Sequence, residues 1–402
     1  MVAGLATGKS ITNPDANFAK AGVELVQARA EHVDAKAKRI RLSDGRELTY
    51  DKLLLGSGAE PFIPPLEGRD LKGVFALRTL TDAERIRAYI ESTRPGRLVF
   101  IGAGFISLEL AAMLGSGSPD DREITVIECL TRPLPLMLGP EFGERVRDYL
   151  VDQGLELRLG AKVARILGDG GVVAGVELDS GETLSADMVF LNVGVRADTR
   201  LAEEIGLETG RFGVVVNRFL ETSDPDILAA GDCAEKPHFI TGKPVPGQLR
   251  GPAVIQGRLA AKRLAGYDIE FPGVLDNSVV RLFDLYVAST GLTAEKARSE
   301  GFATVEATVD SRSKHGMIPG VKPWSISLVF DRDSGRLLGG QIFSEDIAPV
   351  KEIDTINALI LGGKTMRDLT VLMCAGNPDC SSEPSLEPIT IAAEQALQKT
   401  RG

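Results

Sequence analysis

The amino-acid sequence predicts an α/β protein built from more than one domain, and three observations support this prediction. Its 402 residues exceed the usual size of a single domain. Residues 98–128 follow the order strand, glycine turn, helix and strand, which is typical of a nucleotide-binding βαβ unit. From about Leu275 strands alternate with helices in a different pattern, which indicates a separate α+β domain at the C-terminal end.

Composition narrows the class of protein and of partner. The chain is 43% hydrophobic and 25% charged, as expected for a globular protein with several cores. The net charge of −10 argues against nucleic acid or an anionic membrane as a partner. Four cysteines in so long a chain do not suggest a disulfide framework, and the first residues do not resemble a signal peptide. We therefore expect a reducing, cytoplasmic environment.

One apolar run is long enough to suggest a membrane span. It extends from Leu98 to Gly115, but Glu109 lies inside it, and Gly102 and Gly104 interrupt it early. A buried strand that leads into a buried helix explains the run better. No membrane partner is expected.

The first part of the chain is expected to be rich in strands. Residues 22–56 are predicted to form short strands, with a hairpin in KRIRLSDGREL and an apolar strand in DKLLL. Three prolines in PFIPP indicate an extended connector. A helix is predicted over residues 81–92, with Thr81 as the N-cap and Glu84 completing a capping box.

Further elements follow the βαβ unit. Residues 154–191 and 212–235 are predicted to be rich in β-structure, the first with a hairpin turn at residues 179–181. A helix is expected over residues 247–266. The C-terminal part contains predicted strands in VVRLFDLYVAS and SISLVFD, and helices near residues 293–300, 348–361 and 383–399.

The segment LVFIGAGFISLELAAMLGS predicts a dinucleotide site. Gly102 permits a tight turn after the strand, and Gly104 allows the backbone to approach a pyrophosphate. The helix that follows directs its amide N–H groups and positive dipole end at that phosphate. Ser107 stands where a third glycine is usual, and it is small enough for close packing between helix and strand.

The second strand of this unit ends in Glu128. A carboxylate at this place accepts hydrogen bonds from ribose hydroxyls and repels the 2′-phosphate of NADPH. The sequence therefore predicts an NADH site. The alternative is a structural α/β turn without a ligand. The combination of strand, glycines, helix, second strand and terminal acid makes that alternative the weaker one.

Three segments in a fixed order carry a resemblance to a known family. YDKLLLGSGAEP, the dinucleotide unit and FLETSDPDILAAGDCAE follow one another as in the pyridine nucleotide–disulfide oxidoreductases. Within that family the chain looks most like the CoA-disulfide reductase and NADH oxidase branch. The resemblance implies two Rossmann-like domains and a C-terminal α+β dimerisation domain. The implied boundaries are 1–72 with 198–274 for FAD, 73–197 for NAD(P)H, and 275–402 for dimerisation.

The resemblance also implies roles for single residues. In the NADH site, Phe105 matches an aromatic position that shields the flavin, Glu109 lies in the helix on the flavin side, and Gly194 marks the exit from the domain. The NADH residues implied are Gly102, Ala103, Gly104, Phe105, Ile106, Glu109, Glu128 and Gly194. The FAD residues implied are Ser57, Gly58, Ala59, Gly231 and Asp232, where the aspartate accepts a hydrogen bond from the ribityl chain.

The chain departs from the family pattern at its beginning. The family starts with an FAD-binding strand–GxGxxG–helix that holds the FAD pyrophosphate, and the usual redox cysteine follows soon after. Neither is found here, so the FAD-binding domain is expected to lack its N-terminal part, and the catalytic residue is unknown.

The C-terminal segment CAGNPDCSSEPSLEP shows a second departure. Asn377 and Pro378 replace the His-Pro pair of lipoamide and glutathione reductases. Asparagine cannot relay protons as histidine does, which counts against those substrates. Cys374 and Cys380 remain weak redox candidates, whereas the cysteines at positions 129 and 233 are expected to be structural. No metal site is expected, because the three histidines lack ligand spacing.

The resemblance implies an FAD- and NADH-dependent oxidoreductase. Hydride from NADH would reach the flavin, which would reduce a disulfide, a persulfide, a peroxide or oxygen. A homodimer and a small-molecule electron acceptor are the implied partners. Two alternatives stay open: an inactive nucleotide-binding fragment, and a reductase of a small electron-transfer protein.

Overall fold

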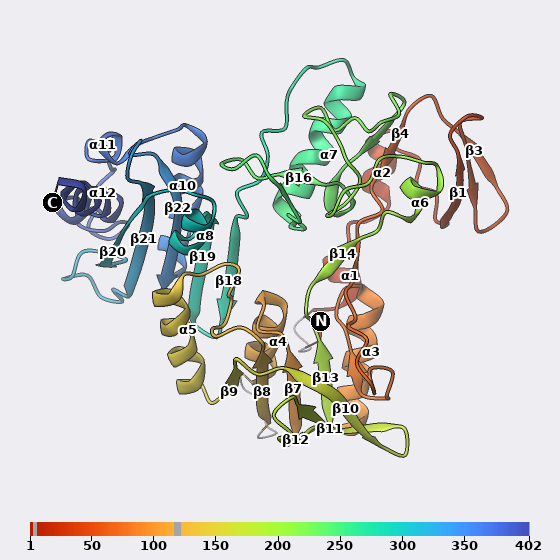
Figure 1. The fold of residues 1–402 in the computed structure, drawn as a ribbon, viewed down its shortest axis with the longest axis horizontal. Helices are drawn as coiled ribbons and strands as arrows, with labels where there is room; N and C mark the ends of the chain where they lie inside the picture. Colours follow the sequence, from red (N-terminus) through yellow and green to blue (C-terminus); the bar gives the residue numbers. More distant parts are fainter. Residues whose placement is uncertain (3–5, 116–121, 402) are drawn as a thin grey trace.

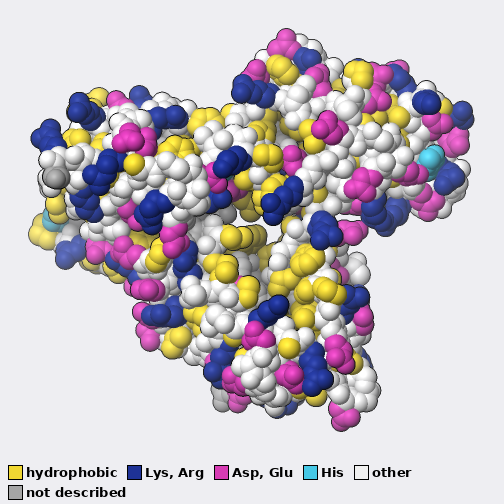
Figure 2. Space-filling model, in the orientation of Figure 1, with side chains coloured by type: hydrophobic (Ala, Val, Ile, Leu, Met, Phe, Trp, Pro, Cys, Tyr) yellow, Lys and Arg dark blue, Asp and Glu magenta, His cyan; other side chains and the backbone are white. Residues whose placement is uncertain are grey.

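The computed structural model describes residues 1–2, 6–115 and 122–401, which form three lobes (Figure 1). One lobe is built on a parallel sheet, one on an antiparallel sheet with C-terminal helices, and one on several small sheets with a long helix. The space-filling view shows a hollow where the three lobes meet, with hydrophobic and basic side chains around it (Figure 2). The mixed α/β class that the sequence predicts is confirmed.

The parallel sheet contains the predicted βαβ unit. Its strand order is β6-β13-β7-β8-β9, with bounds Val74–Phe75, Met188–Leu191, Arg97–Ile101, Glu123–Glu128 and Glu156–Leu159. The helices associated with it are α3 (Leu80–Thr93), α4 (Phe105–Gly115) and α5 (Pro140–Asp152). Residues 116–121 of the predicted unit lie outside the described residues. A small antiparallel sheet follows, formed by β10 (Val163–Asp169), β11 (Val172–Leu178) and β12 (Thr183–Ser185).

The central strands are buried on both faces. All four residues of β13 are buried, as are Leu98 to Ile101 of β7. The rings of Phe100 and Phe190 stack with their centroids 4.5 Å apart. Such continuous apolar runs are typical of parallel strands that are covered on both sides. The apolar run that begins at Leu98 therefore indicates a buried strand and helix rather than a membrane span.

The start of helix α3 differs from the prediction. Thr79 is the N-cap, and its side chain accepts a hydrogen bond from the amide of Asp82 at 3.1 Å. The Asp82 carboxylate in turn accepts the Thr79 amide at 2.8 Å, which completes the capping box. The predicted pair of Thr81 and Glu84 is wrong by two residues, because Thr81 already lies inside the helix.

The lobe of small sheets is assembled from two distant parts of the chain. Its first part contains α2 (Ala16–Lys20), β1 (Ala30–Asp34), the predicted hairpin of β2 (Arg39–Leu42) and β3 (Glu47–Thr49), and then β4 (Leu53–Leu55) and β5 (Ala59–Pro61). The short helix α1 (Gly8–Ile11) lies instead against α3, where Gly8 approaches the side chain of Leu80. Its second part contains β14 (Val195–Ala197), α6 (Arg200–Glu204), β15 (Ile227–Ala229), the 3₁₀ turn η1 (Gly231–Cys233), β16 (Lys236–Pro237), β17 (Pro244–Val245) and α7 (Arg250–Leu264). Strand β4 pairs in parallel with β15, and β5 pairs antiparallel with β14.

The C-terminal lobe is an antiparallel sheet covered by helices. The strand order is β18-β19-β22-β21-β20, with bounds Ser278–Leu282, Leu285–Gly291, Leu337–Ser344, Pro323–Asp331 and Thr304–Arg312. The helices are α8 (Ala294–Ser299), α9 (Ile347–Val350), α10 (Glu352–Leu361), α11 (Met366–Leu369) and α12 (Pro388–Arg401). The α+β architecture predicted from about Leu275 is confirmed.

The parallel sheet and the C-terminal sheet share one hydrophobic core. Leu282 and Val287, from β18 and β19, belong to the same buried cluster as Leu108 of α4 and Val146 of α5. The amide of Gly139 donates to the buried side chain of Gln341 at 2.7 Å, which ties the start of α5 to β22. The interface between these two lobes is therefore packed as closely as the interior of a single domain.

No helix formed by the described residues is long and apolar enough to span a bilayer.

Asp226 provides a test of acid stability. The ammonium groups of Lys38 and Lys52 lie 2.5 Å and 2.6 Å from its carboxylate oxygens and lower its pKa to about 2. A lowered pKa adds stability at pH values above the ordinary aspartate value, and that stability is lost as pH falls towards 2. We expect Asp226→Asn to lower the melting temperature at neutral pH.

This difference should disappear as the pH is lowered to about 2. Thermal unfolding followed by circular dichroism across that range measures it. The matched control is Asp70→Asn, because the Asp70 side chain is 93% exposed. A difference that stays constant with pH would contradict the assigned ion pairs.

Candidate functional site

The turn after β7 has room for glycine alone at its first position. Gly102 has a φ of +97°, and its amide donates to the carbonyl of Ile127 at 2.8 Å. A Cβ atom at this residue would lie 2.8 Å from the carbonyl oxygen of Asn192. At Gly104, by contrast, a Cβ atom would meet nothing within 4 Å. The first glycine thus shapes the turn, and the second leaves open space beside it.

Glu128 is tied to this same turn. One carboxylate oxygen accepts the amide of Ala103 at 2.8 Å, and the other accepts the amide of Leu130 at 2.9 Å and the thiol of Cys129 at 3.3 Å. The residue is 8% exposed. The structure therefore brings Gly102, Ala103 and Glu128 together. The acid also has a structural role that the sequence did not reveal, since these hydrogen bonds hold the turn.

Helix α4 begins at Phe105, directly after the turn. The first amide N–H groups of a helix have no partner within it, so they are available to an anion. Phe105 is 40% exposed and Ile106 is partly buried, whereas Ser107 is completely buried. Ser107 thus packs where a third glycine is usual. The helix of eleven residues provides the dipole that the predicted pyrophosphate site requires.

Glu109 and Gly194 make contacts with segments other than the turn. The Glu109 carboxylate accepts the backbone amide of Arg281 at 3.4 Å, so it lies against β18 of the C-terminal lobe. Burial raises its pKa, and the hydrogen bond from Arg281 opposes that effect. Gly194 has a φ of +120° and accepts the amide of Phe62 at 2.9 Å, in the crossing formed by β5 and β14.

The predicted FAD residues converge from the two distant parts of their lobe. Gly58 has a φ of +78° and accepts the amide of Asp198 at 2.9 Å, and the Ser57 hydroxyl donates to the Asp198 carbonyl at 2.6 Å. Ala59 is buried. Gly231 also has a φ of +78°, and the Asp232 side chain is 13% exposed.

Arg78 connects these residues, and the sequence did not single it out. Its Nη2 donates to the Asp232 carboxylate at 2.8 Å, and its Nε donates to the Ala59 carbonyl at 3.1 Å. It also lies 3.8 Å from where a Cβ atom of Gly58 would be. Arg78 immediately precedes helix α3, so one side chain from the parallel-sheet lobe joins both segments of the FAD set. The sequence around it, LRTLTD, indicates the start of a helix but gives no sign of these contacts.

Buried polar atoms without a partner lie beside both sets of residues. Gln256 of α7 is completely buried, and its side-chain oxygen accepts the Gly231 amide at 2.9 Å. Its Nε2 has no hydrogen-bond partner among the described residues, and neither does the Nδ2 of Asn192 beneath Gly102. Buried polar groups are normally paired, so unpaired donors at these two places fit sites that receive a ligand.

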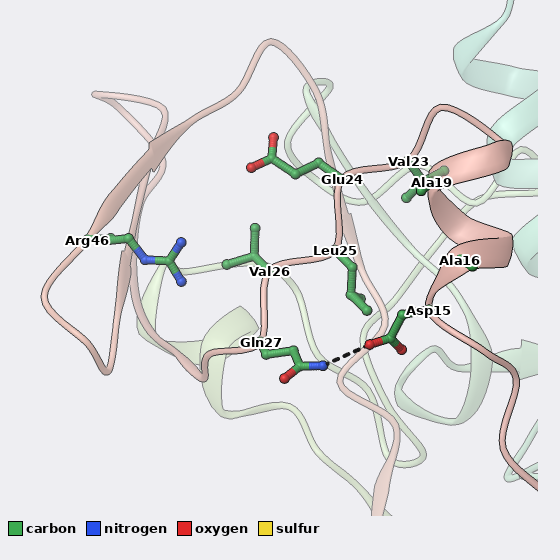
Figure 3. Close-up of a pocket in the computed structure, with 9 residues that line it drawn as sticks. All are labelled: Asp15, Ala16, Ala19, Val23, Glu24, Leu25, Val26, Gln27 and Arg46. Carbon is green, nitrogen blue, oxygen red and sulfur yellow. Dashed lines mark hydrogen bonds between the residues drawn. The ribbon is translucent and has the colours of Figure 1, made fainter. Parts of the chain in front are cut away.

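Two hollows on the surface of the described residues differ in their relation to this site. One, of about 460 Å³, is lined by Ala59 and Arg78, with Thr79 and Asp82 at the start of α3. The other, of about 620 Å³, lies in the N-terminal segment between residues 15–27 and Arg46 (Figure 3). Gln27 donates to Asp15 across it at 3.3 Å. It contains none of the predicted site residues, whereas the smaller hollow adjoins the FAD set.

The cysteines are all reduced. Cys374 and Cys380 are exposed in the segment between α11 and α12, and Cys233 is buried. The Cys380 amide donates to the Asn377 carbonyl at 3.1 Å, within a tight turn. His315 lies at this turn, because its amide donates to the Pro378 carbonyl at 2.9 Å and its Nε2 is 3.4 Å from Glu383.

Comparison with protein families matches almost the whole chain. Residues 6–249 match the family described as pyridine nucleotide-disulphide oxidoreductase. Residues 278–386 match the dimerisation domain of the same family.

Two curated relatives and one solved structure illustrate the similarity. An NADH oxidase of Methanocaldococcus jannaschii is 36% identical over 380 residues, which cover 93% of this chain and 83% of the relative. A CoA-dependent NAD(P)H sulfur oxidoreductase of Pyrococcus abyssi is 33% identical over 384 residues, covering 94% and 84%. The structure of an NAD-dependent persulfide reductase from A. fulgidus superposes with a TM-score of 0.92 at 29% identity, covering 100% of this chain and 75% of that one.

Proposed function

Since this chain belongs to the pyridine nucleotide-disulphide oxidoreductase family, we propose that it passes electrons from NADH through FAD to a disulfide, a persulfide, a peroxide or oxygen. Members of this family are FAD-dependent enzymes that use NAD(P)H. The CoA-dependent sulfur oxidoreductase and the persulfide reductase support a sulfur acceptor, and the NADH oxidase supports oxygen.

NADH would be bound at the start of α4. The amide N–H groups that follow Gly104 would face the pyrophosphate, and Glu128 would accept the ribose hydroxyls. The residues proposed to contribute are Gly102, Ala103, Gly104, Phe105, Ile106, Glu109, Glu128 and Gly194. Their shared setting in residues 73–197 supports an NADH-binding domain with those boundaries.

FAD would be held where two segments of the other lobe meet. The open, positive-φ glycines 58 and 231 allow close approach of a ligand, and Asp232 offers a carboxylate to a hydroxyl. The unpaired Nε2 of Gln256 supplies a buried donor at the same turn. Ser57, Gly58, Ala59, Gly231 and Asp232 thus fit the group, within proposed boundaries of 1–72 and 198–274. FAD supplies the redox chemistry, and the chain orients it.

The observation that carries the proposal is the Arg78–Asp232 pair. Arg78 belongs to the NADH-binding lobe, and Asp232 belongs to the FAD set, yet they lie 2.8 Å apart. The NADH-binding lobe therefore contributes a side chain to the proposed FAD set, so the two lobes are in direct contact there. This contact supports two sites that serve one reaction.

The test is a reductive titration of the purified chain. Because the FAD-binding domain is expected to lack its pyrophosphate-binding part, the titration is made with FAD in excess. Under anaerobic conditions we expect the chain to accelerate the bleaching of the flavin absorbance band by NADH. CoA disulfide, a persulfide and oxygen are then added to separate samples of the reduced protein. Only the true acceptor should reoxidise the flavin and restore its absorbance band. Bound flavin that NADH cannot reduce would contradict the proposal.

Removing the guanidinium group at Arg78 should weaken FAD binding. In Arg78→Met, Asp232 loses its partner in a mostly buried position, and the Ala59 carbonyl loses a donor. We expect FAD affinity to fall about tenfold, which is the loss of about one hydrogen bond to a charged group. Equilibrium titration of flavin fluorescence measures this change.

The matched control is Arg87→Met on the same helix, because Arg87 pairs with Glu91 along the helix surface. Arg78→Lys keeps the charge without the two-pronged geometry, so it should fall between wild type and Arg78→Met. Equal affinities in all four proteins would contradict a role for Arg78.

We also propose a cytoplasmic homodimer. The C-terminal match to a dimerisation domain supports a second copy of the chain as the partner. The four free cysteines support a reducing compartment. Sedimentation at equilibrium tests the first point, since a monomer at micromolar concentration would contradict it.

A further inference from the structure

Lys236 is completely buried, directly behind the turn that carries Asp232. It opens strand β16, and its ammonium group donates to the carbonyl of Gly231 at 2.7 Å and to that of Ala234 at 2.8 Å. Lysine is almost never fully buried, because removing its charge from water is costly. A buried methionine would fill a similar volume without that cost, so the charge itself calls for an explanation.

The peptide group of Gly231 is held from both sides by buried side chains. Gln256 accepts its N–H at 2.9 Å, while Lys236 donates to its carbonyl. Gly231 itself adopts a φ of +78°, which side chains rarely permit. These two contacts fix the backbone immediately before Asp232. The neighbouring Nε2 of Gln256 lacks a partner among the described residues, and a ligand at this turn would satisfy it.

Lys236 also has an electrostatic relation to this turn. Burial lowers its pKa, and the charges of Asp232, Cys233 and Asp276 oppose that shift. Asp276, which follows the core residue Leu275, has a raised pKa because it is itself buried, and His238 opposes that effect. Asp232 thus lies between two cations, the partly exposed Arg78 and the buried Lys236.

We propose that Lys236 is a positioning residue of the FAD site, whose charged form holds the Gly231 peptide and keeps a positive charge behind Asp232. This inference rests on the proposed function. A protonated amine donates stronger hydrogen bonds than a neutral one, and only the protonated form offsets the Asp232 carboxylate. FAD affinity should therefore fall as pH rises through the pKa of Lys236, which burial places below the ordinary lysine value.

The experiment compares Lys236→Met with wild type in FAD titrations from about pH 6 to about pH 10, below the ordinary lysine pKa of about 10.4. At neutral pH we expect Lys236→Met to bind FAD about tenfold more weakly, the loss of one charged hydrogen bond. The gap should narrow as the pH rises, because wild type then loses its own charge. Lys262→Met is the matched control, since Lys262 is exposed on α7, and it should follow wild type.

Lys236→Gln separates the charge from the hydrogen bonds, because its amide still donates but carries no charge. We expect it to lack the pH dependence of wild type, and it serves in place of Lys236→Met should that protein not fold. If neither variant folds, wild type alone tests the inference. An FAD affinity that does not change with pH would then overturn it.

A merely structural Lys236 would give parallel pH profiles, which overturns the inference. The inference would also be overturned if wild type and Lys236→Met bound FAD with affinities within about twofold of each other at neutral pH. A difference of that size is no larger than the usual scatter between independent mutational effects. If wild type binds FAD and the variant equals it, the proposed function survives and this inference fails. If wild type binds no FAD, both fail.

Discussion

Replacing Gly102 with alanine should weaken NADH binding about a hundredfold, the largest effect we expect from a single methyl group in this protein. The φ of +97° disfavours any side chain, at about 1–2 kcal/mol for a left-handed conformation. The new Cβ atom would also lie 2.8 Å from the Asn192 carbonyl, so the turn must shift, at a cost of about 1–3 kcal/mol. Titration of NADH into the purified protein, with thermal unfolding alongside, measures both consequences.

Two other glycines separate the causes. Gly154 has a φ of +87° with nothing near its Cβ position, so Gly154→Ala carries strain without a clash and without a ligand. It should lower stability and leave NADH binding unchanged. Gly104 has open space and no positive φ, so Gly104→Ala should unfold like wild type yet bind NADH more weakly. A Gly102→Ala protein with wild-type affinity would contradict the assignment of this turn.

The second large effect is expected at Glu128. A glutamine has one side-chain acceptor, and its NH₂ group would face an amide N–H that the carboxylate now accepts. Losing a hydrogen bond to a charged group costs about 1.5–3 kcal/mol. We expect Glu128→Gln to lower kcat/KM with NADH by about ten- to a hundredfold. The value with NADPH should fall less, because the charge that repels the 2′-phosphate is gone.

The ratio of the two kcat/KM values is the decisive measurement. Wild type should prefer NADH, and equal or better use of NADPH would overturn the proposed role of the acid. Glu123→Gln is the matched control, since Glu123 begins the same strand and is exposed at the end far from the turn. It should leave both values unchanged.

The sequence predicted the βαβ unit well because its signals are local. Gly102 and Gly104 follow an apolar strand within a few residues, and the hydrophobic period changes from strand to helix at the same place. The hairpin in KRIRLSDGREL was confirmed for the same reason, since β2 and β3 pair across a single turn. Local signals gave the start of α3 two residues too late, because Thr81 and Glu84 form an equally plausible capping pair beside Thr79 and Asp82. They also did not predict the short helices α1 and α2.

The remaining features depend on contacts between distant residues. Arg78 reaches Asp232 across more than a hundred positions, and Lys236 and the buried Gln256 of α7 both bond the backbone of Gly231. Nothing in LRTLTD or AEKPHF distinguishes these side chains from surface residues. The contact of the Glu109 carboxylate with β18 is a further example, because it depends on the packing of α4 on the C-terminal sheet. The roles of the predicted site residues stay predictions.

The core shared by the parallel sheet and the C-terminal sheet has a mechanical consequence. Buried aliphatic side chains such as Leu108, Val146 and Val287 resist sliding, so these two lobes should rotate together as a rigid lever. The third lobe is joined to them by smaller contacts, which include the packing of Phe239 and Ile240 on the C-terminal core and the Arg78–Asp232 pair. Any opening and closing of the molecule would then take place at these smaller contacts. If the C-terminal lobe is anchored to a second subunit, the third lobe would be the part that swings.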